Sequence, residues 1–130
     1  MPVAVNIKDA IATLPELRDR TPYTDGADVS AAFTTLAETN NGGVYAGGFQ
    51  GESAWERHGN GDELVQVLGG ETQMFILIDG VQRTLEMGAG MVAVVPQGCW
   101  HKFNSENGVS LLTMTPQPTD HSTAETPEDV

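Results

Sequence analysis

Short runs of β-branched and aromatic residues fill most of this chain, and Gly, Asn and Asp interrupt them roughly every eight to twelve residues. Such a rhythm is typical of an all-β sandwich or barrel, because each run is long enough for one strand and each interruption suits a turn. The clearest turn signal is Asp79-Gly80, a dipeptide that favours a tight hairpin. We expect strands near 29–37, 43–50, 53–58, 62–68, 72–78, 81–86, 91–95, 99–104 and 108–115.

The two ends of the chain have a different pattern. Residues 6–19 place Ile7, Ile11, Leu14 and Leu17 on one helical face, and Pro15 must kink or split that helix. Residues 117–130 are acidic, contain Pro and have few apolar side chains. We therefore expect an N-terminal helical segment and linker over 1–28, one barrel over 29–116 and a flexible acidic tail over 117–130, in which His121 faces solvent.

Charge and cysteine content exclude several classes of protein. The 130 residues contain 18 Asp and Glu against 6 Lys and Arg, and the net charge of −12 opposes binding to nucleic acid or to an acidic membrane surface. No apolar run approaches the roughly 18 residues that span a bilayer, and the first residues do not resemble a signal peptide. A single Cys99 excludes an intrachain disulfide and a multi-cysteine zinc site. We expect a soluble cytoplasmic protein stabilised by packing.

Two segments concentrate side chains that bind divalent metals. The segment WERHGNGDELVQVLGG contains Glu56, His58 and Glu63, and GMVAVVPQGCWHKFN contains His101. Glu56 and His58 share one face of an extended strand, because side chains two residues apart point the same way, and Arg57 between them points the other way. These four candidate ligands converge only if the strands curl into a barrel with these faces inward.

At these residues the sequence resembles the cupin superfamily, and the resemblance covers roughly residues 44–116. The first cupin motif, G-x5-H-x-H-x3–4-E-x6-G, is matched from its second His onward, and the second motif, G-x5-P-x-G-x2-H-x3-N, is matched as far as its His, with Asn104 one place early. The resemblance implies a small single-domain double-stranded β-helix, the jelly-roll barrel. The matching residues are His58, Glu63 and Gly70 in the first motif and Gly90, Pro96, Gly98 and His101 in the second.

The chain departs from the family pattern at Glu56, which stands where the first His is expected. The implied metal set is then Glu56, His58, Glu63 and His101. A frame that makes His58 the first His and Asn60 the second leaves too few residues before Glu63. Alternatively, Glu56 pairs with an Arg57 of a neighbouring chain or faces water. Two carboxylates favour Mn or Fe(II), with Zn or Ni close behind.

Strand parity also assigns the residues around this site. Val65, Val67, Cys99 and Phe103 share the faces of the candidate ligands and are expected to line a largely apolar cavity, whereas Trp55 and Trp100 point away from it. The continuous apolar run 74–78 predicts a strand buried on both faces, which suggests a subunit interface and a homodimer. Arg83 either binds a substrate carboxylate or lies on the surface.

Proteins that resemble this chain include dioxygenases, isomerases, lyases and sugar-binding modules, so the fold implies no single reaction. Our leading hypothesis is a metal-dependent enzyme, a dioxygenase, isomerase or lyase, acting on a small oxygenated substrate. The alternative is a non-catalytic module that binds or senses a small molecule, which the lack of a general base beyond the candidate ligands favours. A purely structural dimer module would leave the inward-facing charges unexplained.

Overall fold

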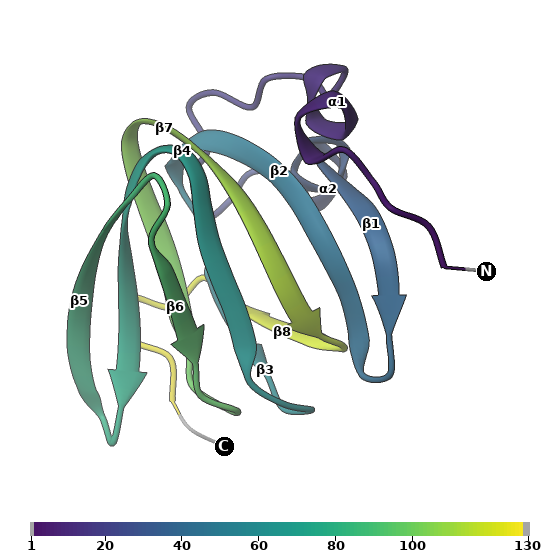
Figure 1. The fold of residues 1–130 in the computed structure, drawn as a ribbon. Helices are drawn as coiled ribbons and strands as arrows, with labels where there is room; N and C mark the ends of the chain where they lie inside the picture. The colour runs from purple at the N-terminus through teal and green to yellow at the C-terminus, as the bar shows by residue number, and fades with distance from the viewer. Residues whose placement is uncertain (1, 129–130) are drawn as a thin grey trace.

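The computed structural model describes residues 2–128, so residue 1 of the expected N-terminal segment and residues 129–130 of the expected tail lie outside the described residues. Within them, two short helices precede and cover part of one curled antiparallel sheet (Figure 1). This architecture confirms the all-β prediction. The helices are α1 (Ile7–Ala12) and α2 (Gly26–Ala31), and the strands are β1 (Phe33–Thr39), β2 (Gly42–Glu52), β3 (Trp55–His58), β4 (Glu63–Ile78), β5 (Val81–Gly88), β6 (Val92–Val95), β7 (His101–Pro116) and β8 (Thr119–Ser122).

Two long strands give the sheet its curl. β4 pairs with β6 at its beginning, with β5 at its end and with β7 along both parts, and β7 also pairs with β2 and β3. Each long strand spans two of the expected shorter strands. Gly70 of β4 lets the pairing of β4 with β7 bend at this point without ending either strand. Gly70 has φ +73° and approaches the Gly108 carbonyl so closely that a Cβ would lie 2.2 Å from its oxygen.

The N-terminal region differs in detail from the expectation. The Asn6 side chain caps α1 by accepting a hydrogen bond from the Asp9 N–H at 2.9 Å, but the helix ends at Ala12 and does not reach residue 19. Pro15 follows within one turn and cannot continue a helix. The second helix, α2, occupies the start of the strand expected over 29–37, because Asp25 caps it by accepting from the Ala27 N–H.

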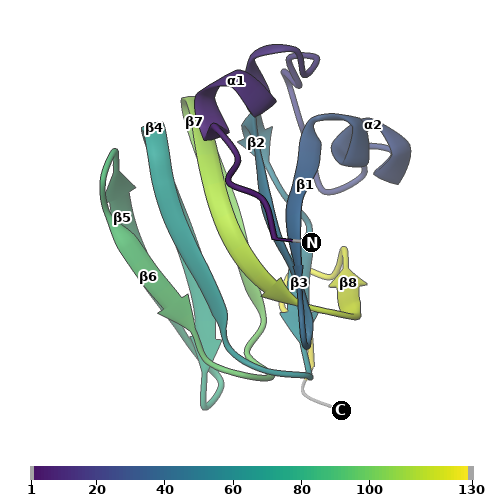
Figure 2. The same ribbon diagram turned by 45° about the vertical axis from the view of Figure 1, so that its right-hand side comes forward.

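The segment expected to be a flexible tail contains β8, which pairs with β3 along residues 119–122 (Figure 2). Beyond β8, backbone carbonyls of the same segment accept hydrogen bonds from two tryptophans: Trp55 Nε1 donates to Glu125 and Trp100 Nε1 donates to Glu128. Polar residues can therefore order a terminal segment when a sheet edge and two indole N–H groups offer them partners.

The apolar run 74–78 is divided between two cores. Met74 and Ile76 lie in the main core inside the curled sheet, and Leu77 packs on the other face with Trp55 and Trp100, with Phe75 against them. The tryptophans thus point away from the barrel interior, as parity predicts. The run is buried on both faces as expected, but this chain's own tryptophans cover its outer face.

Candidate metal centre

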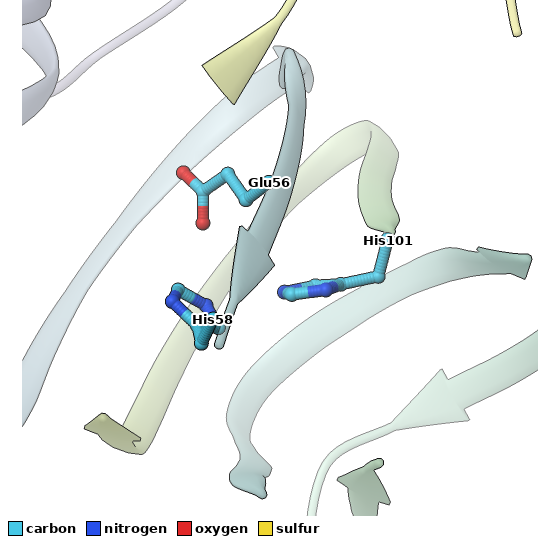
Figure 3. A group of neighbouring side chains, drawn as sticks. All are labelled: Glu56, His58 and His101. Carbon is cyan, nitrogen blue, oxygen red and sulfur yellow. The ribbon is translucent and has the colours of Figure 1, made fainter. Parts of the chain in front are cut away.

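Short strand β3 and the first residues of two neighbouring strands bring the candidate ligands together. Glu56 and His58 project from β3, and His101, the first residue of β7, pairs directly with Glu56 across the sheet. Their side chains point into one space, and one donor atom from each lies within 4.8 Å of the others (Figure 3). Strand parity alone accounts for this arrangement, since cross-strand partners share a face.

The fourth candidate, Glu63, begins β4 and contacts both imidazoles. Its Oε1 lies 2.9 Å from His101 Nε2, its Oε2 lies 3.3 Å from His58 Nε2, and Thr115 Oγ1 donates to Oε2 at 2.6 Å. Glu63 and both histidines are almost fully buried, at 4%, 3% and 0% exposure. A buried carboxylate is costly unless a positive charge balances it, so Glu63 needs either a protonated imidazole or a bound cation beside it.

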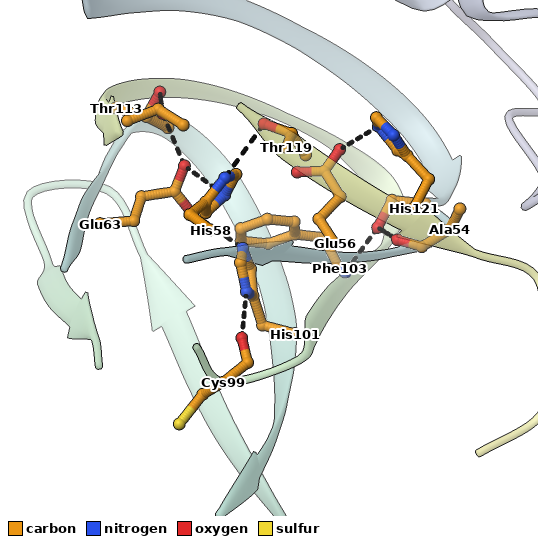
Figure 4. A network of polar contacts seen from close by, with 12 residues as sticks. Ala54, Glu56, His58, Glu63, Cys99, His101, Phe103, Thr113, Thr119 and His121 are labelled. Carbon is orange, nitrogen blue, oxygen red and sulfur yellow. Dashed lines mark hydrogen bonds and ion pairs between the residues drawn. The ribbon is translucent and has the colours of Figure 1, made fainter. Parts of the chain in front are cut away.

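Both imidazoles are held by their Nδ1 atoms (Figure 4). His101 Nδ1 lies 3.1 Å from the Cys99 carbonyl oxygen, which can only accept, so Nδ1 carries the proton. Thr119 Oγ1 donates its proton to Gln117 Oε1, so it accepts from His58 Nδ1 at 3.0 Å. Each histidine therefore turns its Nε2 toward Glu63, which is the orientation that metal-binding histidines take from their supporting partners.

The buried polar atoms at this centre fit a divalent ion. Apart from the ion-pair contacts between the imidazoles and Glu63, the buried atoms His58 Nε2, His101 Nε2 and Glu63 Oε1 have no polar partner within the described part of the chain. Buried nitrogen and oxygen atoms without partners are costly, and two imidazoles with one or two carboxylates form a donor set suited to Mn, Fe, Ni or Zn. The residues present therefore match the group that the family resemblance implies.

The charges of the centre are strongly coupled. Burial acts to raise the pKa of the Glu63 carboxyl, but contacts with His101 and His58 outweigh it and hold that pKa at about 2. Burial acts to lower the pKa of His101, but Glu63 and Glu56 raise it above its usual value. In the absence of a metal, Glu63 and His101 thus stabilise each other as an ion pair.

We expect this ion pair to make the stability of the metal-free protein depend on pH. The lowered pKa of Glu63 means that its contribution is complete above pH 4.5 and is lost as the pH falls toward about 2. The raised pKa of His101 means that its contribution is complete below pH 6.5 and is lost as the pH rises through the raised value. In chelator, the melting-temperature difference between wild type and Glu63→Gln should therefore be largest between pH 4.5 and 6.5. A difference independent of pH would contradict the ion pair.

His121 is exposed to solvent, as the sequence suggested, and it also lies beside Glu56. Its Nε2 is 3.7 Å from Glu56 Oε1, and its side chain is 63% exposed. The contact with Glu56 raises the pKa of His121. Burial acts to raise the pKa of Glu56, but His121 and His101 outweigh it and lower that pKa. Glu56 therefore carries its charge toward the histidines, and the Arg57 beside it instead contacts Asp120, at 3.1 Å.

A cavity of about 370 Å³ opens onto the centre. Of the residues expected to line it, Phe103 does so, whereas Val65 and Val67 are fully buried in the core and Cys99 packs against that core. Strand parity predicted that the last three side chains point to the interior, and there they pack in or against the main core and do not line the cavity. The lining residues are Arg20, Val29, Ser30, Phe33, Tyr45, Phe49, Ser53, Glu56, His58, Glu63, Phe103, Leu111, Thr113, Thr115, Gln117, Thr119 and His121.

Sequence reasoning missed the supporting residues. Thr115 lies near the end of β7. Thr119 and His121 come from a segment without apolar alternation, which gave no strand signal. Arg20 likewise lies in an irregular segment. Arg83, the basic residue considered for substrate binding, is exposed on β5 and does not line the cavity.

Replacing Thr119 tests the orientation of His58. We expect Thr119→Val, which keeps the shape but removes the hydroxyl, to weaken metal binding by about 10- to 100-fold, the range known for supporting partners. Thr119→Ser should retain most of the affinity, because its hydroxyl can still accept from His58 Nδ1. Calorimetric titration with Zn and Mn measures the effect. Equal affinities of wild type and Thr119→Val would remove the supporting role.

The described residues include no helix long and apolar enough to cross a membrane. No protein-family model and no curated protein matches the chain.

Solved structures do match it. A cupin-2 domain protein from Shewanella frigidimarina superimposes with a TM-score of 0.63 at 20% identity, covering 87% of this chain and 94% of that one. Hydroquinone 1,2-dioxygenase from a Sphingomonas species, solved with 4-hydroxybenzoate bound, gives 0.60 at 15% identity, covering 86% and 72%. Oxalate decarboxylase from Bacillus subtilis, described with Mn(II) centres, gives 0.54 at 19% identity, covering 60% of this chain and 23% of that one. At these identities the likeness establishes the fold.

Proposed function

We propose that this chain, whose fold is the cupin double-stranded β-helix, is a metal-dependent enzyme that acts on a small oxygenated substrate. The observation that carries the proposal is the pair of buried imidazoles whose Nδ1 atoms are held and whose Nε2 atoms converge on the Glu63 carboxylate, with no other polar partner among the described residues. Such oriented, unsatisfied donors beside a cavity are typical of a metal centre and are unusual in a packed core.

The roles of the residues follow from their positions. We assign His58, Glu63 and His101 to the ion, with Glu56 as the fourth ligand. A bound divalent ion supplies Lewis-acid chemistry at a carbonyl or enolate oxygen, and Fe(II) extends this to reactions with oxygen. Phe103 and the other apolar lining residues exclude water from the substrate.

His121 supplies what the sequence alone lacked, a titratable group outside the ligand set. Its Nε2 faces Glu56 at the cavity wall, 3.7 Å from Oε1, and this contact raises the pKa of His121 above its ordinary value. We assign it to holding or moving a proton at Nε2. This weakens the main sequence argument for a non-catalytic binding module.

Elemental analysis tests the proposal. Protein purified without chelator or affinity metal should contain about one divalent ion per chain, most simply Mn, Fe, Zn or Ni. Oxygen consumption and product formation are then screened against small diketones, hydroxy acids and sugar derivatives, with a Glu63→Gln variant as control. Protein that contains no metal, takes up none and turns over no compound would favour the non-catalytic module.

We also propose a homodimer, now on a different surface. Trp55 and Trp100 cover the 74–78 run, so we place the interface on another part of the sheet, where β6 exposes Val92 and Val94 and β7 exposes Met114. Val94, 54% exposed, pairs with Leu64, which pairs with the 44% exposed Met114. Sedimentation should give twice 13.8 kDa, and Val94→Glu should dissociate it. A wild-type mass near 13.8 kDa would contradict the dimer.

A further inference from the structure

A buried arginine lines the cavity without a direct ion pair, and the acidic group whose charge acts on it is Glu56 of the same cavity. Arg20 is 8% exposed, and its Nε is buried without a hydrogen bond. Its guanidinium makes no ion pair with any described residue and lies over the Phe49 ring, 4.5 Å from the ring centre. Arginine is rarely buried unless it is paired, because an unpaired buried charge is costly.

The backbone holds this arginine in place. The Arg20 N–H donates to the Gln50 carbonyl at 3.0 Å, and the Glu52 N–H donates to the Arg20 carbonyl at 2.8 Å. Gly51 between them has φ +116°, and a Cβ there would lie 2.3 Å from the Arg20 carbonyl oxygen. Only glycine allows the backbone of β2 to come this close to Arg20, so Gly51 and the two hydrogen bonds together fix the Arg20 backbone beside the cavity.

The charges around the cavity leave a positive excess when a divalent ion is bound. Glu56 and Glu63 then balance the ion, and His58 and His101 bind it as neutral ligands. The remaining charged groups that face this space are Arg20 and the largely exposed His121, whose charge solvent screens. Arg57 and Lys102 are paired elsewhere, with Asp120 and Glu52. When Glu56 is bound to the ion, Arg20 therefore provides one positive charge that no described residue neutralises.

We propose that Arg20 is the anchor for the carboxylate of the substrate, so that the substrate class is a small monocarboxylate whose remaining part fits a cavity of about 370 Å³. The planar guanidinium matches a carboxylate with two parallel hydrogen bonds. Phe33, Phe49 and Phe103 give the rest of the substrate an apolar, aromatic surface. The proposal rests on the proposed function for the bound ion, which leaves the Arg20 charge unbalanced, and for the chemistry that follows binding.

The test compares carboxylates with their neutral amides. Binding of acetate, pyruvate and benzoate, each against acetamide, pyruvamide and benzamide, is measured by calorimetry with metal-loaded and chelated protein. At least one carboxylate should bind loaded wild type about tenfold or more tightly than its amide. Arg20→Gln should abolish the preference, and Arg20→Lys should lose most of it, because an ammonium lacks the planar fork. Arg83→Gln, a matched loss of one exposed basic residue, should leave it unchanged.

Stability and metal content keep the outcomes separate. In metal-loaded protein without carboxylate, Arg20→Met should melt no lower than wild type, because it removes a buried charge that Glu56 no longer balances and fills the same space. Metal bound by the Arg20 variants should equal that of wild type. A carboxylate preference that depends on Arg20, in protein that takes up no metal, would support the anchor and contradict the proposed enzyme. Normal metal content with no preference for any carboxylate, or a preference that survives Arg20→Gln, would overturn the anchor.

Discussion

Glu63→Gln is expected to lose metal binding by more than 100-fold, because it removes a charged ligand, and a change in a supporting partner alone costs about 10- to 100-fold. The consequence for stability follows from linkage. An ion bound only by the folded state adds about 2.7 kcal/mol at a hundredfold excess over Kd. Wild type should therefore melt at a clearly higher temperature with ion than in chelator, and Glu63→Gln should melt at the same temperature in both.

The matched control is Glu71→Gln, the same chemical change at an exposed position of the same strand. It should keep the full response to the ion. Calorimetric melting scans and metal titration measure both quantities. Wild type that keeps its melting temperature and its metal content after dialysis against chelator would argue against a metal centre of this kind.

Variants of Glu56 have the second largest expected effect on metal binding. They decide whether Glu56 replaces the expected His as a ligand or whether the centre has lost its affinity for metal, which we call a decayed centre. If Glu56 is a ligand, Glu56→Gln should weaken binding by about 10- to 100-fold or more, since the amide lacks the charge. Glu56→His should retain the ion and shift the preference toward Zn, Ni or Cu. The position within 4.8 Å of the histidine donors and the lowered pKa of Glu56 both support the ligand role.

A decayed centre would respond in the opposite way. Glu56→His would then gain metal, and Glu56→Gln would change nothing. Titration of wild type and both variants with Mn and Zn separates the two cases without knowledge of the substrate. Full affinity in Glu56→Gln would reduce the site to His58, Glu63 and His101.

The ligand faces could be predicted from the sequence because strand parity is a local property. Glu56 and His58 lie two residues apart on one short strand, and His101 follows the Pro and Gly of a recognisable motif. In any curled sheet of this topology such side chains point to the interior. The outward direction of Trp55 and Trp100 follows from the same rule.

Tertiary structure alone decided which residues complete the centre and how deep the cavity is. Arg20, Thr119 and His121 come from irregular or polar segments outside the expected barrel, and no periodicity marks them, since their positions depend on backbone bonds to distant strands. Val65 and Val67 have the predicted direction but are fully buried in the main core and do not line the cavity. Local alternation determines which way a side chain points, whereas what it meets there depends on residues far away in the chain.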